Sequence, residues 1–207
     1  MSSDAHEVAK QAAYLLYSGA ASEYIQAKKQ AAAELDARAL PSNFDVAMEL
    51  DSIAEELEGW SRRERLVALR TAAFETMQVL ENRYPKLIGS VWRGTANASS
   101  DIDIVVYSDN SEAVLLELAG SGVEILRVVD ESFEESGEKS GSIHIHAILK
   151  PSWNLEVIVR PFVELGKTEF CDIFGDQKRG LGLRELGKVL AEAPEKRFVP
   201  ARRTRRR

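Results

Sequence analysis

The spacing of apolar residues changes once along this chain, near residue 85. Before that point apolar side chains recur every three or four residues, the period of an amphipathic helix. After it they form short alternating or continuously apolar runs, which are typical of strands. The pattern predicts helices first and then a small mixed β-sheet with few helices, an α+β fold class. We expect a helical region over residues 1–84, a second region over 85–192 and a basic tail over 193–207.

Proline, glycine and capping residues divide the helical region. A first helix is expected to continue, weakened at Gly19, until Pro41 ends it. Ser42 is expected to cap a second helix that ends at Gly59. A third helix is expected to begin at the capping box of Ser61 and to end before the first strand.

The second region is expected to alternate strands with two short helices. An acidic, serine- and glycine-rich segment, residues 131–141, predicts an exposed loop. The sequence Pro151-Ser152-Trp153-Asn154 predicts a hairpin connection between the last two long strands. The expected strands cover residues 87–88, 101–107, 123–129, 142–149 and 155–159, and the expected helices cover 111–119 and 181–191.

Composition is that of a globular protein. The chain has 207 residues, of which 44% are hydrophobic, enough for a substantial core. It has no apolar run near the ~20 residues that span a bilayer and no signal-peptide pattern at its start. Cys171 is the only cysteine, which excludes an internal disulfide and a cysteine-based zinc cluster. We therefore expect a cytoplasmic protein with no membrane partner.

Charge is distributed unevenly along the chain. The net charge is −6, yet the last twelve residues contain seven basic side chains and no acid. These are Lys196, Arg197, Arg202, Arg203, Arg205, Arg206 and Arg207. Such a tail, chiefly Arg202–Arg207, either neutralises the phosphates of RNA or is a solvated terminus without a partner.

Two acids one residue apart follow a glycine-serine bend. Asp101 and Asp103 lie on an expected strand, so both carboxylates project from one face, and such oxygens are ligands that Mg²⁺ prefers. Gly89 permits a close turn, and Ser90 offers a hydroxyl and an N–H to a phosphate oxygen. Arg93 adds positive charge for the same phosphates. Paired carboxylates beside a phosphate-binding turn indicate nucleotide chemistry, in which divalent ions assist phosphoryl transfer.

A third carboxylate is expected to complete the metal site. Glu156 is the best candidate, since it interrupts an apolar strand where an unpaired charge is costly. We expect that strand to lie beside the strand of Asp101 and Asp103. Glu124, on another expected strand, is the rival, and a solvent-facing position for Glu156 is the alternative.

Three further groups have two interpretations each. His144 and His146 share a strand face and either contact metal or substrate, or are ordinary sheet residues near a polar cleft, which we favour. Trp92 either stacks on a base or packs beneath the bend. Lys178, next to Arg179, either contacts phosphate or belongs to an exposed basic loop.

Residues 89–103, Gly-Ser-Val-Trp-Arg-Gly-Thr-Ala-Asn-Ala-Ser-Ser-Asp-Ile-Asp, resemble the signature of the DNA polymerase β-like nucleotidyltransferase superfamily. The later strand pair is similar to that of the catalytic domain of archaeal, class I CCA-adding enzymes, which mostly have Asp where this chain has Glu156. The resemblance implies a nucleotidyltransferase catalytic domain over residues 85–192. It also implies that Asp101, Asp103 and Glu156 bind Mg²⁺ as catalytic residues, and that Gly89 and Ser90 hold the triphosphate.

The resulting hypothesis is a magnesium-dependent enzyme that transfers a nucleoside monophosphate from a nucleoside triphosphate, such as ATP, to an acceptor hydroxyl. The arginine tail favours RNA as the acceptor, with a protein hydroxyl or a small molecule as alternatives. Two other hypotheses stay open. One is a catalytically weak or inactive module of the same fold that binds nucleotide or RNA, and the other is a protein-interaction scaffold built on the N-terminal helices.

Overall fold

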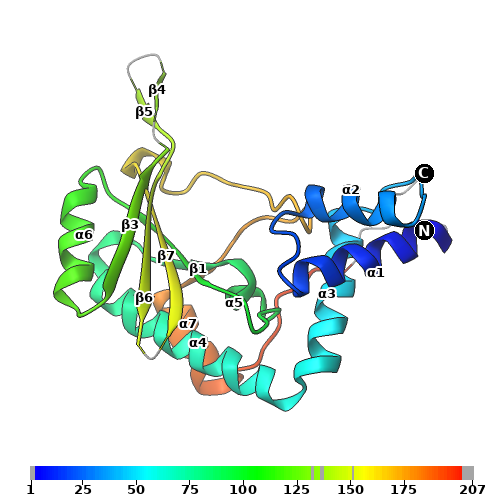
Figure 1. Ribbon diagram of the computed structural model, residues 1–207. Helices are drawn as coiled ribbons and strands as arrows, with labels where there is room; N and C mark the ends of the chain where they lie inside the picture. Colours follow the sequence, from blue (N-terminus) through cyan, green and yellow to red (C-terminus); the bar gives the residue numbers. More distant parts are fainter. Residues whose placement is uncertain (1–2, 132, 136–137, 151, 202–207) are drawn as a thin grey trace.

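A six-stranded mixed sheet with helices packed against it forms the larger part of the molecule, and three further helices lie to one side of it (Figure 1). The computed structural model describes residues 3–131, 133–135, 138–150 and 152–201. The helices are α1 Ser3–Tyr17, α2 Tyr24–Glu34, α3 Asn43–Glu58, α4 Trp60–Val79, α5 Gly89–Arg93, α6 Ser111–Gly120 and α7 Leu183–Glu192, with 3₁₀ turns at Glu81–Arg83 and Phe162–Glu164. The strands are β1 Lys86–Ile88, β2 Ile102–Tyr107, β3 Glu124–Asp130, β4 Phe133–Glu135, β5 Glu138–Ser140, β6 Ile143–Leu149, β7 Trp153–Arg160 and β8 Leu181–Gly182.

The order of strands in the sheet is β3-β6-β7-β2-β1-β8. Only β2 and β7 run parallel, and the other neighbouring pairs are antiparallel. The expected α+β fold is therefore confirmed, as is the hairpin between β6 and β7. The parallel pair places the strand of the two aspartates directly beside the strand of Glu156.

Two separate clusters of buried apolar residues stabilise the two parts. One face of the sheet packs on α4, α6 and α7, with Leu69, Met77, Ile104 and Val157 completely buried. The second cluster is small and alanine-rich and joins α1, α2 and α3. Because α4 belongs to the core of the sheet, the packing continues across residue 84, and the expected domain boundaries stay predictions.

The expectation of one long N-terminal helix is wrong. The helix breaks between α1 and α2, where Gly19 takes a positive φ of 75° and backbone bonds to Leu15 and Leu16 end the first helix. Ala21 is buried in the second cluster. The break lets α2 fold back on α1, and this contact outweighs the helical preference of the intervening residues.

The caps of α3 are confirmed and that of α4 is not. The Oγ of Ser42 accepts a hydrogen bond from the backbone N–H of Asp45, and α3 ends at Gly59. α4 begins at Trp60 directly after Gly59, and the hydroxyl of Ser61 instead donates to the carbonyl of Glu58. A tight corner between two helices has replaced the expected capping box.

The segment expected to be a loop over 131–141 contains a short hairpin. Its strands β4 and β5 pair with each other and project beyond the main sheet (Figure 1). The local pairing satisfies backbone groups that a loop would leave to solvent. Of the basic tail, Lys196 and Arg197 pack against the body of the protein, while Arg202–Arg207 lie outside the described residues. Among the described residues, none of the helices combines the length and apolarity needed to cross a membrane.

The side chain of Arg70 connects α4 to two segments distant in sequence. It is completely buried, and its guanidinium donates to the carbonyls of Val91, Trp92, Pro194 and Lys196 at 2.6–3.1 Å. Burial lowers the pKa of Arg70 to about 10, so the group still carries its charge at neutral pH. One charged side chain thus pairs four carbonyls that the short helix α5 and the C-terminal segment leave open.

Replacing Arg70 tests this connection. We expect Arg70→Met to lower the free energy of unfolding by about 3 kcal/mol or more, because it leaves buried carbonyls without donors. Arg63→Met is the control, since Arg63 is exposed and pairs with Glu55 at the surface. It is expected to change stability by less than about 1 kcal/mol. Urea denaturation of both variants measures the difference, and equal losses would contradict the assignment.

Candidate active site

The bend after β1 brings the backbone against an acid of the neighbouring strand. Ile88 pairs with Asp103 across the β1–β2 ladder, and Gly89 follows with a φ of +69°. A Cβ added to Gly89 would overlap Oδ2 of Asp103. Both the left-handed backbone and the contact with this carboxylate therefore require glycine. The glycine-serine bend and Asp103 form one compact unit.

The acids come from adjacent strands at the same level of the sheet. Asp103 is the register partner of Glu156 in the parallel β2–β7 pair, so the two side chains leave the same face. Asp101 directly precedes β2 and shares that face by alternation. The opposite face carries the buried Ile102 and Ile104. The expected position of Glu156 beside the aspartates is confirmed, whereas its role in metal binding stays a prediction.

Glu124, the rival third acid, lies elsewhere. It is exposed at the start of β3, and β6 and β7 separate that strand from β2. Its register partner is Ile148 of β6. The order of the sheet therefore favours Glu156 as the third acid.

Both histidines contact Glu156. Nδ1 of His144 lies 2.7 Å from Oε1 of Glu156, and Nε2 of His146 lies 3.7 Å from the same oxygen. The other ring nitrogen of His144 is 2.8 Å from the hydroxyl of Ser142. With the carboxylate as acceptor, Nδ1 of His144 donates, so in a neutral ring Nε2 accepts from Ser142. The two histidines therefore lie at a polar site on the sheet, as the favoured interpretation holds, and both contact Glu156 there.

The electrostatic environment of Asp103 opposes its negative charge. Burial, together with the neighbouring carboxylates of Glu156 and Asp101, raises the pKa of Asp103 from 3.8 to about 7, and burial is the largest of these causes. A bound cation would offset the repulsion among the three acids and replace the water that burial removes. The site is therefore better suited to a divalent cation than to three free carboxylates.

The side chains do not form a closed ligand set in this conformation. Within the described parts of the chain, no three acid, histidine or cysteine side chains cluster closely enough to hold a metal ion. Asn154 donates to Oδ1 of Asp101 at 3.0 Å, and His144 holds Glu156. The donor chemistry still fits Mg²⁺, because all three acids offer hard oxygen ligands from one face of the sheet. Ligation by Asp101, Asp103 and Glu156 requires the outer two side chains to exchange these partners.

Arg93 occupies an internal position instead of a free one beside the phosphates. Its guanidinium makes two bonds to the carboxylate of Asp176, at 2.6 and 3.0 Å, and donates to the carbonyl of Phe198. The rings of Trp92 and Phe174 flank it at 4.3 and 4.5 Å. Only 4% of its side chain is exposed. The structure thus gives Arg93 a role in holding residues 174–176, and a contact with nucleotide stays a prediction.

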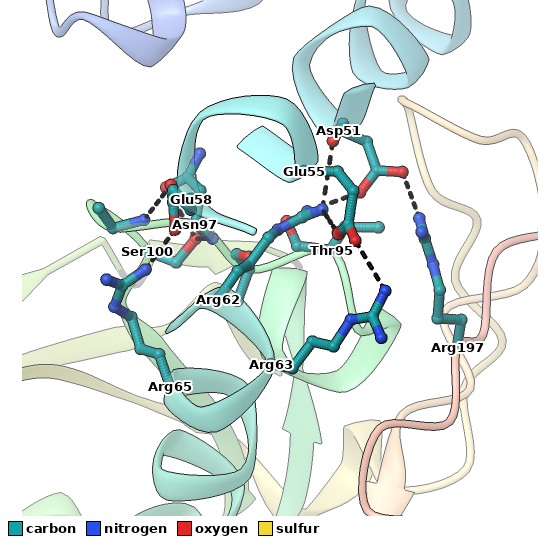
Figure 2. Close-up of polar contacts among 12 residues, drawn as sticks. Asp51, Glu55, Glu58, Arg62, Arg63, Arg65, Thr95, Asn97, Ser100 and Arg197 are labelled. Carbon is teal, nitrogen blue, oxygen red and sulfur yellow. Dashed lines mark hydrogen bonds and ion pairs between the residues drawn. The ribbon is translucent and has the colours of Figure 1, made fainter. Parts of the chain in front are cut away.

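Arg62 holds the loop that joins the bend to the acids (Figure 2). This buried side chain donates to the carbonyls of Ala96 and Thr95 and pairs with Asp51 of α3 at 2.6 Å. Asn97 accepts hydrogen bonds from Ser99 and Ser100 within the same loop. Sequence reasoning missed Arg62, because nothing in the helical period distinguishes a buried arginine from a surface one.

A cavity of about 290 Å³ opens beside Gly89 and Ser90. No pattern in the sequence predicts this cavity, because its walls come from four separate segments. Trp92 contributes one edge while it packs in the main core, which is compatible with packing beneath the bend. Its lining residues are Tyr24, Ala47, Leu50, Asp51, Ile88, Gly89, Ser90, Trp92, Arg93, Thr95, Asn97, Ser100, Cys171, Ile173, Phe174 and Lys178.

Comparisons with solved structures give low similarity. A cytoplasmic RNA terminal U-transferase shares 18% identity at a TM-score of 0.34, covering 56% of this chain and 34% of that one. The Cid1 poly(U) polymerase shares 17% identity at a TM-score of 0.35, covering 55% and 36%. This chain spans little more than a third of the length of these proteins. No curated protein matches the sequence.

A family model gives a direct assignment for part of the chain. The model of the nucleotidyltransferase domain matches residues 86–174. That segment contains the bend at Gly89, the aspartates of β2 and Glu156 of β7. A closer relation to CCA-adding enzymes stays a prediction. Residues 86–174 of this chain are therefore similar to a nucleotidyltransferase domain, and they include the signature at residues 89–103.

Proposed function

We propose that this protein is a magnesium-dependent enzyme that transfers a nucleoside monophosphate from a nucleoside triphosphate to an acceptor hydroxyl. One observation carries the proposal. Asp103 is in register with Glu156 and in contact with the glycine-serine bend, inside the segment that matches the nucleotidyltransferase domain. Acids and phosphate-binding turn thus meet at one point on the sheet.

Each residue has a distinct task in this proposal. Asp101, Asp103 and Glu156 hold Mg²⁺, which when bound lowers the charge repulsion between an attacking oxygen and the phosphates. Ser90 offers its hydroxyl and N–H to the triphosphate, and Gly89 lets the backbone approach it. Without the metal, His144 holds Glu156 through the bond to Oε1, and the carboxylate leaves this partner when it binds Mg²⁺. Asn154 holds Asp101 in the same way.

The acceptor that we propose is RNA. The support is the sequence of the C-terminus, where Arg202–Arg207 provide five arginines in six residues. Phosphate neutralisation by such a cluster favours a nucleic-acid partner over a small molecule. A cytoplasmic location stays a prediction.

A second candidate function is a nucleotide-binding module without turnover. The bond between Glu156 and His144 favours it, because a carboxylate held in this way is less available to a metal ion. The enzyme and the module differ in one measurable property, the release of pyrophosphate.

Substitution of the aspartates distinguishes the two. We expect the wild-type protein to release pyrophosphate from a nucleoside triphosphate when Mg²⁺ and total RNA are present. Asp101→Asn and Asp103→Asn should each lower the rate by about 100-fold or more, since metal stabilisation of charge is worth several kcal/mol. Asp36→Asn is the control, because Asp36 is exposed and has a positive φ that asparagine also adopts. If wild type and all three variants bind nucleotide but none releases pyrophosphate, the nucleotide-binding module is favoured.

Stability of the metal-free protein should depend on the charge of Asp103. Its folded pKa of about 7 exceeds the ordinary 3.8, so the folded state keeps a proton that the unfolded chain releases. The protonated carboxyl group of Asp103 therefore makes its full contribution to the free energy of unfolding below about pH 4. This contribution is lost as the pH rises to about 7, and above that pH stability no longer changes through Asp103. At pH 8, Asp103→Asn should exceed wild type by about 2–4 kcal/mol, with a much smaller difference at pH 4.

Urea denaturation of both proteins at pH 4, 6 and 8 in EDTA checks this expectation. Added Mg²⁺ should stabilise wild type more at pH 8 than at pH 6, because at the lower pH it must displace a proton. Parallel pH profiles for wild type and Asp103→Asn would show that Asp103 titrates normally and would contradict this account of the site.

A further inference from the structure

Part of the cavity beside the bend is built by residues that precede the nucleotidyltransferase domain. Tyr24 begins α2, and Ala47, Leu50 and Asp51 lie on α3. All four line the same space as Gly89 and Ser90, although they lie outside the matched residues 86–174. The N-terminal helices therefore complete a cavity that the matched segment leaves open on one side.

The loop over residues 169–178 provides the facing wall. It contributes Cys171, Ile173, Phe174 and Lys178 to the lining. Backbone bonds from Gly175 to Cys171 and from Lys178 to Glu169 make it a compact turn. In Figure 1 the chain after β7 leaves the sheet, reaches the N-terminal helices and returns to α7.

Side-chain contacts attach this loop to α5 and to α3. On one side Arg93 of α5 makes two bonds to Asp176. On the other, the side-chain amide of Asn43 donates to the carbonyl of Asp172 at 3.4 Å, and Phe44 packs edge-on against Phe174 at 5.8 Å. These contacts attach the loop to α3 on one side and to α5 on the other. The loop therefore keeps a fixed position, and the cavity beside it is a defined space.

Ion pairs also hold the part of the cavity wall that Asp51 forms. Asp51 pairs with Arg62 through one oxygen and with Arg197 through the other (Figure 2). Arg62 also binds the carbonyls of Thr95 and Ala96, so α3 and the loop before β2 keep one relative position. The pair with Arg62 is buried and the pair with Arg197 is partly exposed, and together they fix the position of Asp51 before a ligand binds.

The chemistry of the lining selects a class of ligand. Most of the exposed lining surface is apolar, and Tyr24 and Phe174 contribute aromatic rings to it. The volume of about 290 Å³ is close to the lower limit of small-molecule sites, about 300 Å³. Ser90 and Lys178 add polar groups on the same lining. Gly89 lines this cavity and also lies against Asp103, so a ligand that extends past Gly89 reaches the acids.

We propose that this cavity binds the base and ribose of the nucleoside triphosphate, and that α2 and α3 form one of its walls. The inference rests on the proposed function and adds to it a binding role for the N-terminal helices. Residues before the nucleotidyltransferase domain thus contribute to nucleotide affinity.

Filling the cavity from α3 tests the proposal. Ala47 is buried and lines the cavity, whereas its neighbour Met48 is 38% exposed and does not. Ala47→Phe should weaken the binding of a nucleoside triphosphate by about 10-fold or more in calorimetric titration with Mg²⁺. Met48→Phe should bind as wild type does. Inorganic tripolyphosphate, which lacks base and ribose, should bind wild type and Ala47→Phe equally.

A second pair of variants covers the case in which Ala47→Phe does not fold, as judged by circular dichroism. Tyr24→Ala should weaken nucleoside triphosphate binding at least 5-fold, while Tyr14→Ala, an exposed tyrosine on α1 outside this cavity, should not. Unchanged nucleotide affinity in the folded cavity variants overturns the proposed pocket while leaving the enzyme intact. A wild-type protein that binds neither nucleoside triphosphate nor tripolyphosphate overturns the proposed function itself.

Discussion

The contact between Gly89 and Asp103 is the constraint on which the candidate site depends. The antiparallel pairing of β1 and β2 sets Ile88 opposite Asp103, and the bend that follows has space only for a glycine. The parallel pairing of β2 and β7 then sets Glu156 beside Asp103. Burial of this carboxylate among other acids raises its pKa, so the fold keeps an unfavourable charge where a cation would be stabilised. The sheet determines where the acids lie, and the bend determines where phosphates can approach them.

Buried arginines connect this site to the rest of the molecule. Arg70 joins α4 to α5 and the C-terminal segment, and Arg62 joins α3 and α4 to the loop before β2. Arg93 joins α5 to the loop that lines the cavity. Each is a buried positive charge that an acid or several carbonyls satisfy, so removal of either partner leaves an uncompensated polar group. These three arginines thus hold the N-terminal helices and the C-terminal segment to residues 86–174, and one of them, Arg93, also lines the cavity.

Local patterns in the sequence predicted β1, β2, β3, β6 and β7, the cap at Ser42 and the position of Glu156 within its strand, but they missed β4, β5 and β8. These depend on the alternation of side chains and on backbone chemistry within a few residues. Other features could not be predicted, because they arise from contacts distant in sequence. The sequence places Arg93 near the bend but does not indicate the direction of its side chain, which depends on Asp176, 83 residues later. The bond from His144 to Glu156 likewise depends on the register of β6 and β7, which no motif encodes. The roles of these residues in catalysis are proposals that the fold makes testable.

A structure determined with Mn²⁺ and a non-hydrolysable nucleoside triphosphate shows whether Asp101, Asp103 and Glu156 bind a metal beside the bend at Gly89. Anomalous scattering locates the Mn²⁺ independently of activity. We expect metal density within about 2.0–2.3 Å of carboxylate oxygens of Asp101 and Asp103, and we expect the triphosphate to contact Ser90. We also expect Glu156 to have turned from His144 toward the metal. Metal or triphosphate bound elsewhere, with the aspartates unliganded at saturating Mn²⁺, would contradict this account.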